Sequence, residues 1–322
     1  MNKKKYLITG VAGFIGFNFA KFLLLKKYNV YGIDNLDQYY SVKLKKKRLN
    51  ELKKFKNFKF HKFNIEINHE FNKLKIRNLD YIYHFAAQAG VRYSVINPEK
   101  YINTNILGTI NVLKYASNIR PKKIFFASSS SVYGDSKKFP LNEKDKLYPK
   151  NIYASSKIIN EISAKKFSEQ YKIKMYGLRF FTVYGEWGRP DMLLFKIIKA
   201  FTEKKTLKLN NSGNHYRDFT YISDVSEILF KLGNVKINKQ FDIFNICSNN
   251  PQFIKKIIDN FSSVYGKLKV KNYPKNKLDV FKTHGNNNKV SKLIQKKKFT
   301  DFDTGLKNTF EWYKKINSKL IY

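Results

Sequence analysis

Short apolar segments alternate with helical stretches through the first half of the chain. The segments are rich in β-branched and aromatic residues and lie at residues 6–9, 29–33, 59–63, 81–85, 123–128 and 175–180. Stretches with helical spacing of apolar residues separate them, as at 14–26 and 102–117. Strands this short and apolar, connected through helices, pair in parallel and are covered on both faces. The alternation therefore predicts an α/β fold built on a doubly wound parallel sheet.

The chain of 322 residues is long enough for two domains, and the pattern changes near residue 181. Beyond that point the alternation of strands and helices loosens into longer loops. We therefore expect one domain at 1–180 and a smaller C-terminal α/β domain at 181–322. Part of about 220–246 is expected to pack back on the first domain. The Lys-rich region 37–58 is expected to be a helical excursion with a solvated face.

A glycine-rich loop joins the first predicted strand to the first predicted helix. Gly10, Gly13 and Gly16 have the spacing Gly-x-x-Gly-x-x-Gly. In a strand–loop–helix unit, such glycines allow a tight turn, close approach of the backbone to a pyrophosphate and close packing of helix on strand. The free N–H groups and the dipole of the helix that begins at Phe14 would hold the phosphates. The loop predicts a dinucleotide-binding domain of the Rossmann type.

An acidic residue stands at the end of the second predicted strand. Asp34 follows Gly16 by 18 residues. A carboxylate at this position accepts hydrogen bonds from both ribose hydroxyl groups and repels a 2′-phosphate. Asp34 therefore favours NAD over NADP.

The charge of the chain is far from balanced. The sequence has 63 basic and 24 acidic residues, a net charge of +39, which suggests nucleic acid or another anionic surface as partner. Only seven of the basic residues are Arg, however, and the lysines are spread from end to end without a nucleic-acid-binding motif. We therefore expect no specific nucleic-acid partner. The lysines are interpreted mainly as background composition that helps to attract an anionic small molecule.

Several other classes of protein are disfavoured by composition. One cysteine, Cys247, excludes a disulfide framework, and the five histidines lack metal-ligand spacing, so no metal site is expected. The basic N-terminus and the apolar run that follows imitate a signal peptide, but Asn18 and Lys21 interrupt the run. No stretch reaches the roughly 20 apolar residues of a membrane span. We expect a cytoplasmic protein without membrane insertion.

A tyrosine and a lysine are placed to act together. Tyr153 and Lys157 are four residues apart and fall on one face of a predicted helix. A nearby cation lowers the pKa of a phenol, so Tyr153 is predicted to act as a general acid/base near neutral pH. Upstream, the strand at 123–128 ends in the serine run 128–131, at the edge where open α/β sheets bind ligands.

The order of glycine loop, serine-rich strand end and Tyr-x-x-x-Lys resembles the extended short-chain dehydrogenases/reductases, in particular the nucleotide-sugar epimerases and dehydratases. The resemblance spans nearly the whole chain and is closest to the UDP-glucuronate 4-epimerases. The strings that carry it are DQYY (37–40), AAQAGVRYS (86–94), LRFFTVYG (178–185), WGRPDM (187–192) and RDFTYI (217–222).

The resemblance implies NAD as cofactor and a set of residues that would hold it. In this set Lys157 would bind the nicotinamide ribose. The implied cofactor residues are Gly10, Gly13, Phe14, Ile15, Gly16, Asp34, Asn64, Ile65, Ala86, Ala87, Tyr153 and Lys157.

The resemblance also implies a reaction at C4 of a UDP-sugar. Tyr153 would be the base, and Ser129 would bridge the sugar O4 and the phenol. Related 4,6-dehydratases and decarboxylases tend to carry an acidic residue just before Val-Tyr-Gly, where this chain has Ser130 and Ser131, which favours epimerisation through a 4-keto sugar. The implied substrate residues are Arg92, Ser130, Ser131, Thr182, Arg189 and Arg217, with Arg217 on the diphosphate, Arg189 at the uridine or sugar end and Arg92 near a sugar carboxylate.

Some alternatives stay open. UDP-glucose or a UDP-N-acetylhexosamine could replace UDP-glucuronate as substrate, and loss of CO₂ would indicate a decarboxylase. Three positions depart from the family pattern: Asn64 and Asn286 where Asp is usual, and Glu186 where Pro is usual. Glu186 would add a charge beside the loop that binds the sugar acid. The family forms homodimers through two helices, here expected at 106–118 and 153–170 in a four-helix contact.

Overall fold

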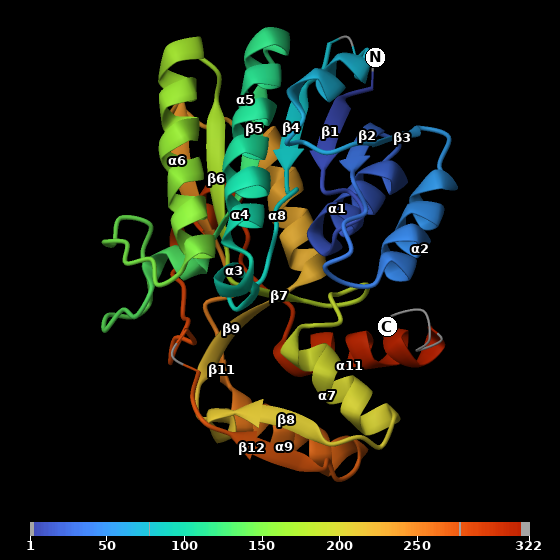
Figure 1. The fold of residues 1–322 in the computed structure, drawn as a ribbon, viewed down its shortest axis with the longest axis vertical. Coiled ribbons are helices and arrows are strands. Elements are labelled where there is room, and N and C mark those ends of the chain that lie inside the picture. The colour runs from blue at the N-terminus through green and yellow to red at the C-terminus, as the bar shows by residue number, and fades with distance from the viewer. Residues whose placement is uncertain (1–2, 77, 277, 317–322) are drawn as a thin grey trace.

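The computed structural model of the protein describes residues 3–76, 78–276 and 278–316. Its centre is a parallel sheet of seven strands in the order β10-β6-β5-β4-β1-β2-β3 (Figure 1). This order is that of a Rossmann-type doubly wound sheet, so the predicted fold class is confirmed. The strands are β1 (Lys5–Thr9), β2 (Asn29–Asp34), β3 (Phe58–Lys62), β4 (Tyr81–His84), β5 (Lys123–Ser129), β6 (Met175–Phe180) and β10 (Phe241–Ile246).

Helices cover both faces of this sheet, as the alternating side chains of β1 illustrate. Tyr6 and Ile8 belong to one hydrophobic core, and Leu7, which points the other way, belongs to a second core. In Figure 1 the pair α5 and α6 lies in front of the sheet and α8 lies behind it. The helices of this part are α1 (Phe14–Leu25), α2 (Val42–Lys53), α3 (Tyr93–Ile96), α4 (Pro98–Tyr101), α5 (Gly108–Ile119), α6 (Ile152–Tyr171) and α8 (Ile222–Asn234).

The predicted helix at 102–117 has two parts. Its first turn, Ile102–Leu107, is π-helical and only the remainder, α5, is α-helical. Asn105 lies in the wide turn, is fully buried, and exchanges hydrogen bonds with the backbone of Gln88 at 2.7 and 3.2 Å. The wide turn thus brings a buried amide to the segment after β4, as π-bulges at functional sites commonly do.

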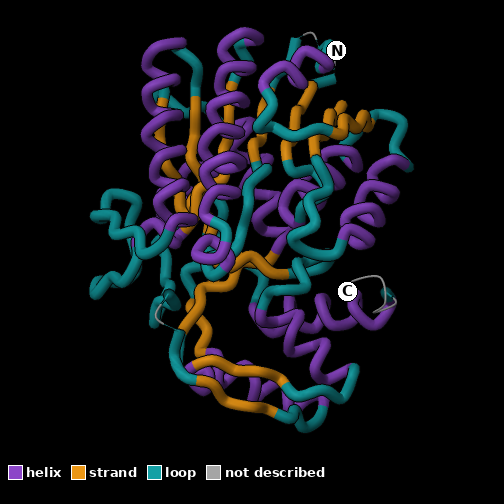
Figure 2. Tube along the Cα trace, in the orientation of Figure 1, coloured by secondary structure: helices purple, strands orange, loops and turns teal. Residues whose placement is uncertain are grey.

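The remaining elements form a smaller α/β lobe, at the bottom of Figures 1 and 2. Strands β7 (Thr182–Tyr184), β9 (Tyr216–Tyr221) and β11 (Pro251–Phe253) form one small sheet. A second one pairs β8 (Leu207–Asn210) with β12 (Val270–Tyr273). The helices here are α7 (Leu193–Thr202), α9 (Ile254–Tyr265), α10 (Asn288–Ile294) and α11 (Phe302–Lys315), of which α10 packs against α8 and β10.

The chain returns to the central sheet after entering the smaller lobe. Helix α8 packs against α1, and β10 pairs with β6 as the outermost strand of the large sheet. Most of the segment 220–246 therefore lies against the part of the chain that was expected to form the first domain. The division at 180/181 stays a prediction. Nothing in the described residues is both long and apolar enough to form a membrane-crossing helix.

Candidate active site

A cleft of about 720 Å³ runs along the carboxyl ends of the large sheet and down to the smaller lobe. This is the edge at which doubly wound sheets bind ligands, and the volume lies in the range of ligand pockets. The glycine loop and Asp34 line one end, the serine run and Tyr153 line the middle, and Arg217 lines the other end. All predicted site residues line this cleft except Asn64. The residues on either side of Asn64, Phe63 and Ile65, do line it.

The glycine loop has the geometry that a dinucleotide requires. Gly10 has a φ of +72°, and a Cβ on Gly16 would lie 2.2 Å from the carbonyl oxygen of Gly10. Gly13 is the N-cap of α1, and no side chain caps that helix end. The first N–H groups of α1, from Phe14 and Ile15, therefore face the cleft without a competing side-chain acceptor. The loop fits a pyrophosphate.

Asp34 ends β2 beside this loop. Its carboxylate accepts hydrogen bonds from the backbone N–H groups of Ala12 at 3.0 Å and Leu36 at 2.8 Å. Burial raises the pKa of Asp34, opposed by these two hydrogen bonds and by the nearby Lys45 and Arg48 cations. A buried carboxylate held in this way fits a ribose and not a 2′-phosphate.

Helix α2 contributes more than a solvated excursion. Lys45 lines the cleft and is 6% exposed, and Arg48 is fully buried. The expected solvated face is present at Lys43, Lys46 and Lys53, whereas Lys45 and Arg48 fall on the buried face. The signal was in the spacing, since Leu44, Leu49 and Leu52 mark a buried stripe on which Lys45 and Arg48 also fall.

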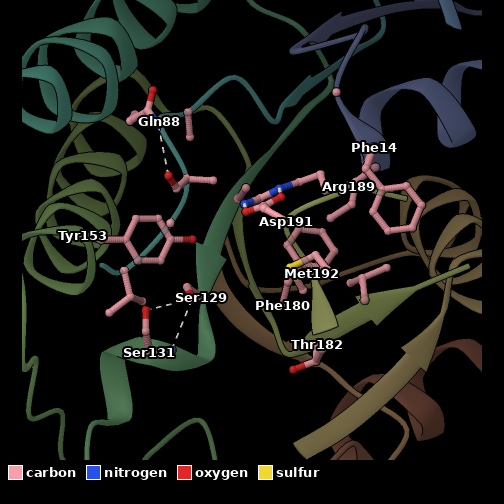
Figure 3. Close-up of a pocket in the computed structure, with 18 of the residues that line it drawn as sticks. Phe14, Gln88, Ser129, Ser131, Tyr153, Phe180, Thr182, Arg189, Asp191 and Met192 are labelled. Carbon is pink, nitrogen blue, oxygen red and sulfur yellow. Dashed lines mark hydrogen bonds and ion pairs between the residues drawn. The ribbon is translucent and has the colours of Figure 1, made fainter. Parts of the chain in front are cut away.

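The serine run occupies the end of β5 and the single turn after it. Ser129 is 9% exposed, and its Oγ accepts hydrogen bonds from the backbone N–H of Ser131 at 3.2 Å and from the Ser131 hydroxyl at 2.8 Å. Figure 3 shows Ser129 and Ser131 just below the hydroxyl end of Tyr153. The predicted meeting of the serine run with the tyrosine thus occurs in the structure.

Tyr153 and Lys157 lie one turn apart on α6, as their spacing predicts. The Lys157 ammonium is 5.8 Å from the centroid of the Tyr153 ring and donates a hydrogen bond to the carbonyl oxygen of Ala127 at 3.0 Å. Burial lowers the pKa of Lys157 to about 8. The protonation state of a lysine with such a pKa responds readily to the charge of a neighbouring ligand.

The pKa of Tyr153 differs from the sequence-based expectation. Burial raises it, and the opposing influences are a hydrogen bond with Ser129 and the Arg189 cation, not Lys157. The expectation of a lowered pKa underestimated how completely the cleft removes this phenol from water. The Arg189 cation thus favours the phenolate.

Arg189 is held by its own loop. Its guanidinium forms an ion pair with Asp191 at 2.5 and 3.0 Å, and burial of the pair is compensated by these bonds. In Figure 3 the pair lies across the cleft from Tyr153, with Thr182 below it. Sequence reasoning named Arg189 but missed Asp191, although the two are only two residues apart.

The other two predicted arginines meet at the far end of the cleft. Arg92 forms an ion pair with Asp279 at 2.7 Å. Burial lowers the pKa of Arg217, with Asp279 opposing and the Arg92 cation adding to the effect, so the two arginines are close neighbours. Lys196 and His215 line the same end. The structure thus places Arg92 with Arg217, and this basic group suits a doubly charged phosphate chain.

Two departures from the family pattern lie away from the cleft. Glu186 does not line it, and its carboxylate accepts a hydrogen bond from the Tyr221 hydroxyl at 2.6 Å. The Glu186 carboxylate, expected to add a charge beside the sugar-binding loop, therefore bonds Tyr221 outside the cleft. The backbone of Asn286 is bonded to Leu141 and Asn245, outside the cleft as well. No group of metal-ligating side chains occurs within the part of the chain that is described.

Comparison with known proteins agrees with this geometry. The model of the NAD dependent epimerase/dehydratase family matches residues 6–247. The UDP-glucuronate 4-epimerase of Thermodesulfobacterium geofontis is 38% identical, with 98% of each chain covered. The UDP-glucuronic acid 4-epimerase of Bacillus cereus, solved with UDP-glucuronic acid and NAD, is 29% identical, with a TM-score of 0.90 over 97% of this chain and 99% of that one.

Another solved structure is similar at lower identity. The UDP-glucose 4-epimerase of Thermotoga maritima, solved with UDP-glucose, is 26% identical, with a TM-score of 0.88 over 97% of this chain and 99% of that one. The family model spans the glycine loop, the serine run, the tyrosine–lysine helix and the predicted arginines Arg92, Arg189 and Arg217. The chain therefore belongs to the NAD dependent epimerase/dehydratase family.

Proposed function

We propose that the protein is an NAD-dependent UDP-sugar 4-epimerase and that its substrate is UDP-glucuronate. One observation carries the proposal: Tyr153 and Ser129 lie in the middle of one cleft, between a pyrophosphate-binding glycine loop and a basic group at Arg92 and Arg217. A dinucleotide at one end and a nucleotide diphosphate at the other would bring their reactive carbons together beside Tyr153. The 38% identical relative and the Bacillus cereus neighbour, both named as UDP-glucuronate epimerases, support the choice of sugar.

The chemistry that NAD supplies when bound is reversible acceptance of hydride from the sugar C4. Tyr153 takes the proton from O4 as the C4–H bond breaks and returns it after the 4-keto sugar has turned over. Ser129 would hold O4 and the phenol in line, and Lys157 would hold the nicotinamide ribose. A tyrosine-to-phenylalanine variant of the Bacillus cereus enzyme has been solved with a 4-deoxy-4-fluoro substrate analogue, which supports a tyrosine base at this position.

Retention of the C6 carboxylate would depend on the groups around Tyr153. A 4-ketouronate is a β-keto acid and loses CO₂ when its carboxylate aligns with the ketone. Ser130 and Ser131, in place of an acid, offer hydroxyl donors, and Thr182 and Arg189 line the opposite wall. Arg92, bonded to Asp279 beside Arg217, is assigned to the diphosphate in this proposal.

The test is a product assay. Purified protein is incubated with UDP-glucuronate, and the products are separated by anion-exchange chromatography and identified by the proton coupling at C4. UDP-galacturonate should form without net NAD reduction. Formation of UDP-xylose would indicate the decarboxylase instead, and no C4 inversion on any UDP-hexose would refute the proposal.

UDP-glucose is the second candidate substrate, for a specific reason. Asp191 already binds Arg189 through two hydrogen bonds, so this guanidinium is less available to a sugar carboxylate, although its charge still acts on Tyr153. The similar Thermotoga maritima enzyme is named for UDP-glucose. A ratio of kcat/KM for UDP-glucuronate over UDP-glucose above ten would favour the uronate, and the inverse ratio would favour the neutral sugar.

We also propose that the protein is a homodimer through a four-helix contact. Apolar side chains are exposed on α6 and on the π-helical turn that precedes α5: Ile159, Ile162, Ile102 and Leu107 are 39–58% exposed. Such a stripe on adjacent helices is usually covered by a partner. Light scattering should give a mass near 76 kDa, twice the 38.1 kDa of the chain, and Ile162→Lys should give the monomer.

A further inference from the structure

Arg48 is a fully buried arginine that joins segments far apart in the chain. It lies on α2, and its two terminal nitrogens donate hydrogen bonds to three backbone carbonyl oxygens and one hydroxyl. Nη1 donates to Ala12 at 2.8 Å and to the Tyr40 hydroxyl at 2.8 Å. Nη2 donates to Trp187 at 2.5 Å and to Gly188 at 3.1 Å. The bonds to Trp187 and Gly188 span about 140 residues of sequence.

The hydrogen bonds of this guanidinium go to neutral acceptors and not to a carboxylate. Among the described residues Arg48 takes part in no ion pair, and its Nε has no hydrogen-bond partner. A buried charge is costly to desolvate unless it is compensated by hydrogen bonds. Asp34 is near enough for its charge to interact with Arg48, but the direct hydrogen bonds go to neutral acceptors, whose positions Arg48 fixes in return. A planar fork can bond several carbonyl groups in fixed directions, which a lysine cannot do.

The acceptor on the cofactor side belongs to the glycine loop. Ala12 lies between Gly10 and Gly13, and its own N–H donates to Asp34 at 3.0 Å. The peptide groups on both sides of Ala12 are thus fixed, one by Asp34 and the other by Arg48. The loop that fits the pyrophosphate is therefore held from outside the cleft by α2.

The acceptors on the sugar side belong to the turn that carries Arg189. Trp187 has a φ of +62°, a backbone conformation that residues other than glycine rarely adopt and that persists only where the surroundings impose it. Its ring packs on Phe17 at 4.9 Å and on Trp312 at 5.3 Å. Arg48 bonds the carbonyl groups of this residue and of the next one, immediately before Arg189.

Tyr40 forms a second connection between the two arginines. The centroid of its ring is 5.6 Å from the guanidinium carbon of Arg48 and 6.0 Å from that of Arg189. Arg189 in turn is one of the two groups that favour the phenolate of Tyr153. A chain of contacts therefore leads from Arg48 to the proposed base.

We propose that Arg48 is a positioning residue that fixes the turn at Trp187 and Gly188 to the glycine loop and so holds Arg189 opposite Tyr153. The role in catalysis rests on the proposed epimerase function, whereas the role in holding the turn does not. Arg48 does not line the cleft, so it contacts neither the substrate nor the cofactor in this proposal. Its loss should move Arg189 and leave Tyr153, Ser129 and Lys157 in place.

The first test is spectroscopic and needs no activity. The chain has two tryptophans, and Trp312→Phe leaves Trp187, which is 9% exposed, as the single emitter. In this background and with saturating NAD, Arg48→Gln should shift the emission of Trp187 to longer wavelength because the turn opens to water. Arg48→Lys should give a smaller shift. The matched controls are Arg120→Gln, an exposed arginine, and Ile228→Val, a small loss of core packing in α8, and both should leave the emission unchanged.

The second test is the pH profile of epimerisation, with the tryptophans intact. Because the Arg189 cation lowers the pKa of Tyr153, its displacement in Arg48→Gln should move the acidic limb of kcat to higher pH and lower kcat at neutral pH at least tenfold. Ile228→Val should leave the limb in place, since a purely structural defect lowers the amount of active protein and not its pH dependence.

The outcomes are separable. An unmoved Trp187 emission together with an unmoved acidic limb in Arg48→Gln would overturn the proposal. So would an Arg48→Lys protein that fails to fold, because the residue would then serve the fold as a whole. If the wild-type protein epimerised no UDP-hexose, the proposed function would fail, and the emission of Trp187 would still decide whether Arg48 holds the turn.

Discussion

Glu161 and Arg179 form a buried, bidentate ion pair beside the end of β5. Glu161 accepts from Nε of Arg179 at 2.9 Å and from Nη2 at 2.7 Å, and the Ser128 hydroxyl donates to the same carboxylate at 2.5 Å. Glu161 lies one turn beyond Lys157 on α6, and Ser128 immediately precedes Ser129 on β5. The pair therefore joins the helix that carries the proposed base to the strand that carries the proposed bridging serine.

Glu161→Gln should destabilise the protein strongly. The variant leaves Arg179, which is 4% exposed, as an uncompensated buried charge, and breaking such a pair from one side costs about 3–5 kcal/mol in the free energy of unfolding. Urea unfolding of wild type and variant measures this loss. The control is Glu169→Gln on the same helix, where the ion pair with Lys166 is exposed and no measurable change is expected. Equal stabilities of Glu161→Gln and wild type would contradict the prediction.

Tyr153→Phe should abolish most of the turnover and leave binding intact. The ring keeps its edge contact with Tyr101, whose centroid is 6.1 Å away, and only the hydroxyl is lost. Removal of a general acid/base commonly costs about 10²–10⁴-fold in kcat. Initial-rate kinetics give kcat, and calorimetry with UDP gives the binding constant, which should match that of wild type. Tyr148→Phe, at an exposed tyrosine, is the control. A Tyr153→Phe enzyme with wild-type kcat would exclude Tyr153 as the base.

Arg217→Lys should weaken substrate binding without slowing the chemical step. Arg217 lines the end of the cleft to which our proposal assigns the diphosphate, and a planar guanidinium can bind two phosphate oxygens there, whereas a lysine cannot. Loss of one charge-assisted hydrogen bond is worth about 1.5–3 kcal/mol, which corresponds to a KM roughly 10- to 100-fold higher. A change confined to KM marks uniform binding of ground and transition states. If kcat fell while KM stayed constant, Arg217 would belong to the reacting end instead.

How far the sequence predicts this structure depends on how local each signal is. The strand β6 was predicted at its observed bounds, and the other five early strands within one residue at each end, because short apolar strands between helices form a local pattern. The glycine loop and the Tyr153–Lys157 spacing are equally local. The early strands, the glycine loop and the Tyr153–Lys157 spacing are all found in the structure, because each depends on residues close together in the chain.

Contacts between distant segments were not predictable in the same way. Arg48 lies in a run of lysines that looks solvent-exposed, and its partner turn at Trp187 is far away in sequence. The upward pKa shift of Tyr153 follows from burial by the whole cleft, which no short motif encodes. The seventh strand, β10, could be anticipated only as part of a broad segment, because its partner β6 precedes it by more than sixty residues.

Asp218 should make stability depend on pH in an unusual direction. It is fully buried next to Arg217, and its carboxylate accepts from the hydroxyl of Ser248 at 2.8 Å, from the N–H of that residue at 3.1 Å and from the N–H of Gly285 at 3.0 Å. Burial nevertheless raises its pKa to about 6, with these bonds opposing. Since the folded-state pKa exceeds the unfolded one, near 4, this group stabilises the fold below pH 4 and loses that contribution as the pH rises through 6.

The measurement is the free energy of unfolding in urea at pH 4.5 and pH 7.5, for wild type and for Asp218→Asn. All other titrating groups contribute equally to both proteins, so the difference between them isolates Asp218. An asparagine does not titrate, and its amide nitrogen would face one of the backbone donors, so the variant should be less stable at both pH values. The advantage of wild type should be larger at pH 4.5 by about 2 kcal/mol, because the folded state there binds a proton that the unfolded state mostly lacks. An advantage that is constant, or larger at pH 7.5, would mean that Asp218 is held as a carboxylate by Ser248 and Gly285 more strongly than burial disfavours it.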